Sequence, residues 1–175
     1  YVIAVPHNII GPRQKYDDPY RNVASFMMNL MLQNRRPVIY GDGEQQRCFS
    51  YVDDCLSCLV KMGFQDGLSG QTINIGPDEQ PVTINELARV IGNITMYRGL
   101  TPAHLPDRPR EVKVALCSSN KARRLLGYQT KTPLREGLTA MRDAMLIRGV
   151  RPFVYHLPLE IVTDAIPRTW LDRLF

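Results

Sequence analysis

The chain has 175 residues, of which 44% are hydrophobic and 22% charged, and it carries a formal net charge of +5 at pH 7. This composition is typical of a globular protein that buries a core, and it excludes a disordered or low-complexity chain. The apolar stretches are too short and too polar for a bilayer span, and no signal-peptide pattern is present, so we expect no membrane association and a cytoplasmic location.

The first predicted element is a strand over residues 1–5, whose β-branched apolar side chains are typical of a parallel strand buried on both faces. A chain that opens inside such a strand, without an initiator methionine, is expected to be part of a longer protein. Pro6, Asn8 and Gly11 end the strand. Apolar residues at helical spacing follow Asn22 and predict a helix that ends near Asn34.

A short strand is predicted over residues 38–40, and it leads into a turn over residues 41–43 that needs the backbone freedom of glycine. Residues 48–52 are predicted as extended chain that completes a hairpin-like excursion. Asp53 and Asp54 follow, at the start of the next helical pattern. We expect them to cap that helix as its N-cap and first-turn carboxylates.

Residues 71–76 are predicted as a second buried strand, and Thr83 with Glu86 has the spacing of a capping box. A proline-rich connection then leads to a strand over residues 112–116. Two further helices are predicted, one from Ser118 to Gly127 and one beginning at Pro133. The remainder is expected to be mostly extended and to serve only in packing, with a last helical turn around Trp170.

Three polar residues stand where strands end and loops begin, the usual place for ligands in α/β proteins. They are Asn8, Arg47 and Arg108. The planar fork of arginine suits phosphate, but each residue taken alone also fits a structural role as turn former, edge charge or solvated linker. There is no glycine-rich phosphate loop, no Ser/His/Asp arrangement and no carboxylate pair, so these residues alone predict an α/β domain that could bind anions.

The cysteines are four in number and do not have the spacing of a secreted disulfide framework or a zinc site. Cys55 and Cys58 lie in a helical pattern, so we expect two thiols on one buried face and no metal site.

Several motifs occur together in a fixed order. Residues 6–14 read PHNIIGPRQ and residues 40–54 read YGDGEQQRCFSYVDD, which resemble RPxNVYGPRQ and YGDGxQxRxFxYVDD of the extended short-chain dehydrogenases. That family includes UDP-glucose 4-epimerases and dTDP-glucose 4,6-dehydratases. Later segments are similar to its NIG, PVTILELA, RPGDV and SKAxxxLGY motifs and stand at residues 74–76, 81–88, 108–112 and 120–128. Two positions depart: Val5 stands where arginine is usual, and Arg110 replaces a glycine, which leaves the base preference open.

The resemblance implies an α/β fold, namely the C-terminal substrate-binding domain of an extended short-chain dehydrogenase with the last two parallel strands of its Rossmann sheet. Residues 1–150 would form the nucleotide-sugar-binding portion, in which residues 1–12 and 71–77 are the final Rossmann strands. Residues 151–175 would form an extended C-terminal tail.

The resemblance also implies contacts to the phosphates and ribose of a nucleotide sugar. Asn8 and Arg108 would bind the diphosphate, Arg47 the phosphate and ribose, and Glu111 the ribose hydroxyls. This is chemically coherent because arginines balance the diphosphate charge and a carboxylate accepts from hydroxyls.

The base and nucleoside would be held by four further residues. Asn22 and Val23 would contact the nucleotide from the start of a helix, while Val38 and Tyr40 would line the base, with Tyr40 stacking on it.

The cofactor implied is NAD, with Pro6 and His7 passing near the nicotinamide. The family's glycine-rich NAD loop and its Tyr-x-x-x-Lys pair would align upstream of Tyr1. We therefore predict no catalytic residue in this chain and expect it to be inactive alone.

The predicted function is that of the C-terminal part of an NAD-dependent nucleotide-sugar epimerase, similar to UDP-glucose 4-epimerase. Alternatives are a dTDP-glucose 4,6-dehydratase or UDP-glucuronate decarboxylase fragment, or a non-catalytic nucleotide-sugar-binding or oligomerisation module. A nucleic-acid partner is disfavoured because the basic residues form no run, and DNA binding would be steeply salt-dependent. The unpaired edge of the two Rossmann strands predicts a homodimer.

Overall fold

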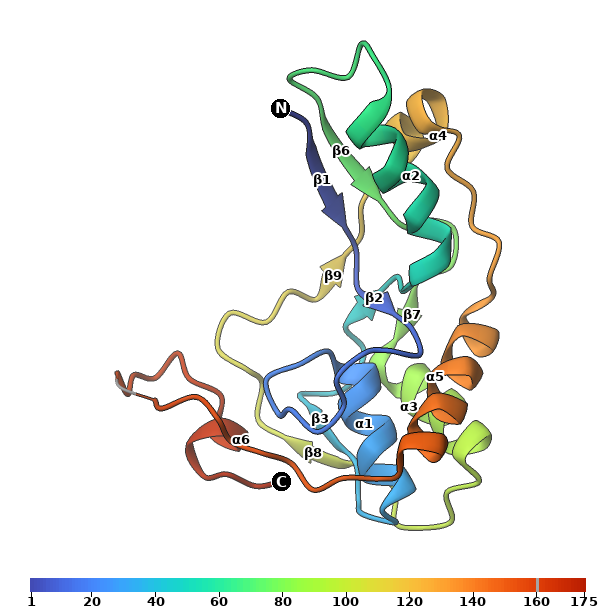
Figure 1. The fold of residues 1–175 in the computed structure, drawn as a ribbon. Helices are drawn as coiled ribbons and strands as arrows, with labels where there is room; N and C mark the ends of the chain where they lie inside the picture. The colour runs from blue at the N-terminus through green and yellow to red at the C-terminus, as the bar shows by residue number, and fades with distance from the viewer. Residues whose placement is uncertain (160) are drawn as a thin grey trace.

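The computed structural model describes residues 1–159 and 161–175. At one end of the molecule β1 (Ile3–Pro6) pairs in parallel with β6 (Thr72–Ile75), in the register Ile3 to Thr72. Helices α2 (Val52–Phe64) and α4 (Asn120–Leu126) pack beside this pair (Figure 1). The α/β fold with two parallel strands, predicted from the sequence, is confirmed.

The prediction that the first strand is buried on both faces is wrong. Ile3 and Val5 of β1 are 47% and 36% exposed, whereas Ile73 and Ile75 of β6 are completely buried. The reason is that β1 has β6 as its strand neighbour on one edge and no other strand pairs with it among the described residues. An apolar strand therefore remains half covered.

A second core lies among three helices, α1 (Val23–Leu32), α3 (Ile84–Thr95) and α5 (Leu134–Arg148). Their apolar faces meet in residues with at most 1% exposure, which include Met27, Leu30, Leu87, Ile91, Leu138 and Met141. The predicted helix starts are confirmed: the Asn22 side chain accepts from the Ala24 amide, and both bonds of the Thr83–Glu86 capping box are present. Local capping thus positions α1 and α3 before they pack.

The predicted hairpin is wrong. β3 (Val38–Tyr40) pairs with β8 (Ala103–Leu105), a strand that the sequence presented as a proline-rich connection. β4 (Gln46–Arg47) pairs in parallel with β9 (Val114–Ala115) and antiparallel with β7 (Val82–Thr83). The glycine turn between β3 and β4 forms as expected, with positive φ at Gly41 and Gly43, but it redirects the chain between two sheets. Long-range pairing with residues 103–115 has replaced the local pairing.

The connection between the two cores runs through β2 (Ile9–Ile10) and β5 (Ser50–Tyr51), which pair in parallel. Helix α5 approaches these strands closely at Gly137, where a Cβ atom would lie 3.0 Å from the Tyr51 ring. Any larger residue at that position would push α5 away from the strands.

The C-terminal segment, residues 151–175, crosses the helical core and returns as α6 (Arg168–Leu171), the helical turn that the sequence predicted near Trp170 (Figure 1). Its start is held by backbone contacts, since Val154 donates to the Asp17 carbonyl at 2.9 Å. The Asn29 side chain donates to the Arg151 carbonyl, also at 2.9 Å.

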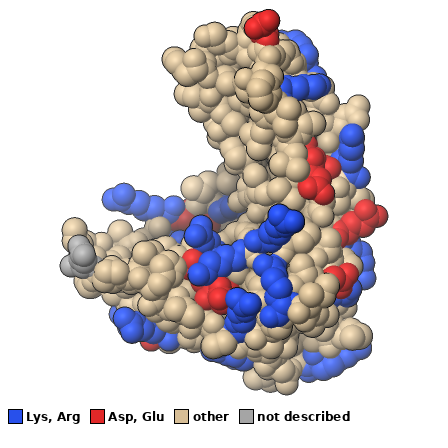
Figure 2. Space-filling view, in the orientation of Figure 1, with Lys and Arg blue, Asp and Glu red and all other residues tan. Residues whose placement is uncertain are grey.

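The surface is uneven in charge. Figure 2 shows lysine and arginine side chains gathered over the lower half of this face, while the end that carries β1 and β6 has few charges. The same view shows the molecule hollowed between that end and the C-terminal segment. Among the described residues, no helix combines the length and apolar character needed to cross a bilayer.

Asp53 and Asp54 both lie in the first turn of α2, as predicted, but neither is its N-cap residue, which corrects that part of the capping prediction. Helix α2 begins after Tyr51, which makes no side-chain capping bond. Asp54, only 8% exposed, instead accepts from the backbone amides of Lys131 and Thr132 at 3.0 Å and from the Thr132 hydroxyl at 3.1 Å. It thereby holds the loop that leads into α5. The Asp53 side chain is exposed, and its carboxylate interacts favourably with the positive end of the helix dipole.

Replacing Asp54 by alanine is expected to lower the free energy of unfolding by about 2 kcal/mol or more, because three donors lose a charged acceptor. Asp53→Ala is the matched control and should cost less than about 1 kcal/mol. Urea titrations followed by circular dichroism measure both values. Equal effects of the two substitutions would contradict the assigned role of Asp54.

Candidate functional site

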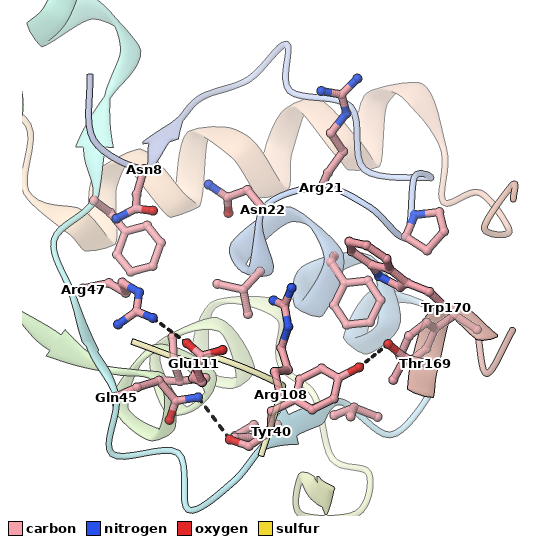
Figure 3. Close-up of a pocket in the computed structure, with 18 residues that line it drawn as sticks. Asn8, Arg21, Asn22, Tyr40, Gln45, Arg47, Arg108, Glu111, Thr169 and Trp170 are labelled. Carbon is pink, nitrogen blue, oxygen red and sulfur yellow. Dashed lines mark hydrogen bonds and ion pairs between the residues drawn. The ribbon is translucent and has the colours of Figure 1, made fainter. Parts of the chain in front are cut away.

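A pocket with a cavity volume of about 260 Å³ opens where the start of α1, the end of β3, β4 and α6 come together (Figure 3). The sequence predicted eight substrate-binding residues, and the fold brings all eight to its walls. They are Asn8, Asn22, Val23, Val38, Tyr40, Arg47, Arg108 and Glu111. Residues that are up to a hundred positions apart in the chain thus share one cavity.

Arg47 and Glu111 form an ion pair on one wall, with 2.5 Å between Arg47 Nη2 and Glu111 Oε1. Both side chains are 15% exposed, so the pair is only partly screened by solvent. They meet because β4 pairs with β9, which sets the Arg47 strand beside the segment that follows Glu111. Arg47 Nη1 also donates to the Gln46 carbonyl at 2.7 Å.

Arg108 lies between two aromatic rings. Its guanidinium carbon is 5.5 Å from the Tyr40 ring centroid and 5.7 Å from that of Trp170, and Figure 3 shows it projecting between Trp170 and the Arg47–Glu111 pair. The Tyr40 hydroxyl is hydrogen-bonded to the Thr169 hydroxyl. Part of the Tyr40 face expected to stack on a base is therefore covered by Arg108.

Two asparagines on the pocket wall also have structural contacts. Asn8 has a left-handed backbone, with a φ of 35°, and its Nδ2 donates to the Cys48 carbonyl at 2.9 Å. Asn22 caps α1 through Oδ1, and its Nδ2 donates to the Ile9 carbonyl at 3.3 Å. The first amides of α1 stand beside them, and a helix N-terminus attracts anions.

Sequence reasoning missed several lining residues. Arg21 directly precedes Asn22, where the predicted helix begins, which was a usable signal; its Nε donates to Asp18 at 3.0 Å. Gln45 stands inside the recognised motif at residues 40–54, is 5% exposed and donates to the Tyr40 carbonyl. Its Oε1 has no hydrogen-bond partner within the described part of the chain, which leaves one acceptor unsatisfied at the wall.

The C-terminal segment also reaches the pocket, so the purely packing role expected for it is incomplete. Thr169, Trp170 and Phe175 all line the cavity. No motif pointed to them, because they become neighbours of Tyr40 only when α6 folds back.

Pro6 and His7 do not line this pocket. They lie at the carboxyl end of β1, where the His7 amide donates to the Ile75 carbonyl at 3.0 Å and Ser50 Oγ donates to the His7 carbonyl at 2.5 Å. The buried His7 Nε2 lacks a partner within residues 1–159 and 161–175. These two residues form a location separate from the pocket.

The predicted burial of the Cys55 and Cys58 thiols on one helix face is confirmed. Cys55 and Cys58 are 1% and 0% exposed on the inner face of α2, and both are free thiols. Burial raises the pKa of Cys55 to about 11, which keeps it protonated and unreactive near neutral pH. No group of three metal-ligating side chains occurs in the described ranges.

The parallel strand pair with its helices, and a cationic pocket beyond it, define a class: an α/β chain of the extended short-chain dehydrogenase type. Residues 1–141 match the model of the family described as GDP-mannose 4,6 dehydratase, and the chain belongs to this family of nucleotide-sugar epimerases, dehydratases and decarboxylases.

The chain is 29% identical to a UDP-glucose 4-epimerase of Mycolicibacterium smegmatis, with 76% of this chain and 41% of that protein covered. It is 32% identical to UDP-glucuronic acid decarboxylase 1 of Xenopus tropicalis, over 75% and 30% of the two chains.

Solved structures agree in fold. A Thermotoga maritima UDP-glucose 4-epimerase, solved with UDP-glucose, superimposes with a TM-score of 0.75 at 30% identity, covering 85% of this chain and 46% of that one. A Bacillus cereus UDP-glucuronic acid 4-epimerase in complex with UDP-glucuronic acid and NAD gives 0.75 at 29% identity, with the same coverage. The chain thus spans less than half of each of these relatives.

Thiol labelling tests the buried cysteine pair. Of the four cysteines only Cys117 is partly exposed. Burial raises its pKa and slows its reaction, but at pH 8 it should still react with a disulfide reagent faster than the other three, which should react only on unfolding. Cys117→Ala should abolish the fast phase. Rapid reaction of Cys55 or Cys58 in the folded protein would mean that α2 is not packed as described.

Proposed function

We propose that this chain is the nucleotide-sugar-binding part of an NAD-dependent epimerase and that its pocket holds the nucleoside diphosphate. The observation that carries the proposal is the convergence of Arg21, Arg47 and Arg108 on one cavity that contains a single carboxylate, Glu111. Arg21 is paired with Asp18 and Arg47 with Glu111, so the positive charge of Arg108 is the one that these carboxylates leave unbalanced in the cavity. A diphosphate needs several such donors, and arginine supplies them in pairs.

A bound ligand would replace some of the contacts that the pocket residues make with one another. A phosphate bound to Arg47 would compete with Glu111 for the Arg47 guanidinium. The Glu111 carboxylate would then be free to accept hydrogen bonds from ribose hydroxyls. Arg108 can turn toward the diphosphate while keeping its stem beside Tyr40. The amides at the start of α1, next to Asn22 and Val23, offer further donors to an anion.

The base would lie toward Val38 and Tyr40, once the Arg108 guanidinium that now covers part of the Tyr40 ring has turned toward the diphosphate. Gln45 supports this orientation, because its unsatisfied Oε1 stands beside the Tyr40 carbonyl to which its Nε2 donates. An N–H group of a base is the kind of donor that such an acceptor lacks.

NAD is the proposed cofactor, and it would accept a hydride from the sugar and later return it. The position of His7 is compatible with this group: it lies at the carboxyl end of a parallel strand, where cofactors approach, and its buried Nε2 lacks a partner within the described residues. Pro6 and His7 would bound one side of the nicotinamide site. The sequence contains no Tyr-x-x-x-Lys pair, so the chain alone is expected to be inactive.

Epimerisation at carbon 4 is favoured over decarboxylation or dehydration. The support is that the solved relatives named above are both 4-epimerases. The similarity to UDP-glucuronic acid decarboxylases keeps decarboxylation as the second candidate reaction.

Calorimetric titration with UDP-glucose tests the pocket. Arg47→Ala and Arg108→Ala should each weaken binding about tenfold or more, because each removes a charge-assisted hydrogen bond. Arg89→Ala is the charge-matched control, since Arg89 is exposed on α3 outside the cavity. Equal weakening by all three substitutions would mean that affinity depends only on the net charge of the protein, and it would contradict a specific diphosphate site.

We expect two copies of the chain to associate through β1, whose Ile3 and Val5 are exposed beside an unpaired strand edge. Analytical ultracentrifugation at high concentration should then give twice the chain mass, and Ile3→Lys should restore the monomer. Val162→Lys, at an exposed apolar residue of the C-terminal segment, is the control and should leave the dimer intact. A wild-type monomer at high concentration would rule out this association.

A further inference from the structure

The C-terminal segment is fixed to the domain at both ends. Near its start, the Phe153 ring centroid lies 5.1 Å from that of Phe26 on α1. At its end, Phe175 contacts the same Phe26 ring edge-on at 4.4 Å. The Phe175 amide also donates to the Tyr155 hydroxyl at 3.0 Å. Residues 153–155 and 169–175 therefore form a wall that is packed on the domain.

Helix α6 turns this wall toward the pocket. Trp170 meets Tyr20 edge-on at 5.1 Å, which fixes the orientation of its indole. Thr169 is 2% exposed, and its hydroxyl is bonded to that of Tyr40 across the end of the cavity. This bond joins the last part of the chain to the strand β3 that would receive the base.

The wall closes the base end and limits the space there. Tyr40, whose hydroxyl is bonded to Thr169, cannot move outward without breaking a buried contact. The cavity of about 260 Å³ is small for a ligand site, since such pockets usually measure roughly 300–1,000 Å³. The Arg108 guanidinium occupies this same end, 5.5 Å from the Tyr40 ring centroid and 5.7 Å from that of Trp170, so a base that stacks on Tyr40 has only the space that Arg108 and the wall leave free.

We infer that Thr169 and Trp170 are specificity-determining residues that make this pocket select a pyrimidine nucleoside diphosphate over a purine one. A pyrimidine has one ring and fits against the closed end, whereas the second fused ring of a purine would have to displace the indole. The inference rests on the proposed function, because it presumes that the pocket holds a nucleotide.

The residues of this wall lie outside the part of the chain that matches the family model, which ends at residue 141. The recognised motifs, by contrast, supply the phosphate and ribose side of the pocket. The base selectivity would therefore be a property that the segment beyond residue 141 adds to a shared phosphate site.

Competitive titration with UDP and GDP tests the inference. The wild-type chain should bind UDP at least tenfold more tightly than GDP by calorimetry. Trp170→Ala should reduce this ratio to threefold or less by admitting the purine. Arg168→Ala, on the same helix but with a side chain that is 75% exposed and outside the cavity, is the control and should keep the wild-type ratio.

A second variant tests the inference independently, in case Trp170→Ala does not fold. Thr169→Val keeps the size of the side chain and removes the bond to Tyr40, so it should also lower the UDP to GDP ratio. Trp170 is the sole tryptophan of the chain, and in Thr169→Val and wild type its fluorescence should change on UDP binding.

The outcomes separate the two proposals. Equal affinity of the wild-type chain for UDP and GDP, or a tenfold ratio that persists in both folded variants, would overturn the selectivity and leave the phosphate site intact. Failure of both nucleotides to bind the wild-type chain would overturn the proposed function and, with it, this inference.

Discussion

The pairing of β3 with β8 and of β4 with β9 holds the pocket together, because each pairing joins segments more than sixty residues apart. The first sets Tyr40 beside Leu105 and so brings Arg108 over its ring. The second sets Arg47 near Glu111. Backbone hydrogen bonds of a few short strands thus determine where the charged side chains meet, and the helical core behind them supplies the burial that keeps such short strands paired.

The polar groups of the pocket are held by protein contacts that a ligand can replace. The Arg47–Glu111 pair is partly buried, and a pair in that position adds little net stability because desolvation offsets much of its attraction. The stack of Arg108 between two rings is likewise worth on the order of 1 kcal/mol. Such contacts orient the arginines in advance without binding them so strongly that an anion could not compete.

Much of the local structure was predictable from the sequence because its causes are local. Thr83 and Glu86 form the predicted capping box within one helical turn, and α1 begins directly after Asn22, where the apolar spacing placed its start. The strand at residues 72–75 follows from a short run of β-branched residues. The motif resemblance went further, since it named eight residues that share one cavity. The predictions failed where a partner far along the chain changed the outcome. β8 replaced the expected hairpin partner of β3. The Asp54 carboxylate accepts hydrogen bonds from the amides of Lys131 and Thr132 instead of capping its own helix.

The sequence by itself determined the family, the starts of α1 and α3 and most of the polar residues available for a diphosphate, because these depend on motifs and neighbours within a few positions. Only the tertiary structure decided which strands pair and how far β1 is exposed. It also decided that Thr169 and Trp170 close the pocket. Those features arise from contacts between distant segments, and a contact such as that of Thr169 with Tyr40 leaves no periodic or spacing signal in either segment.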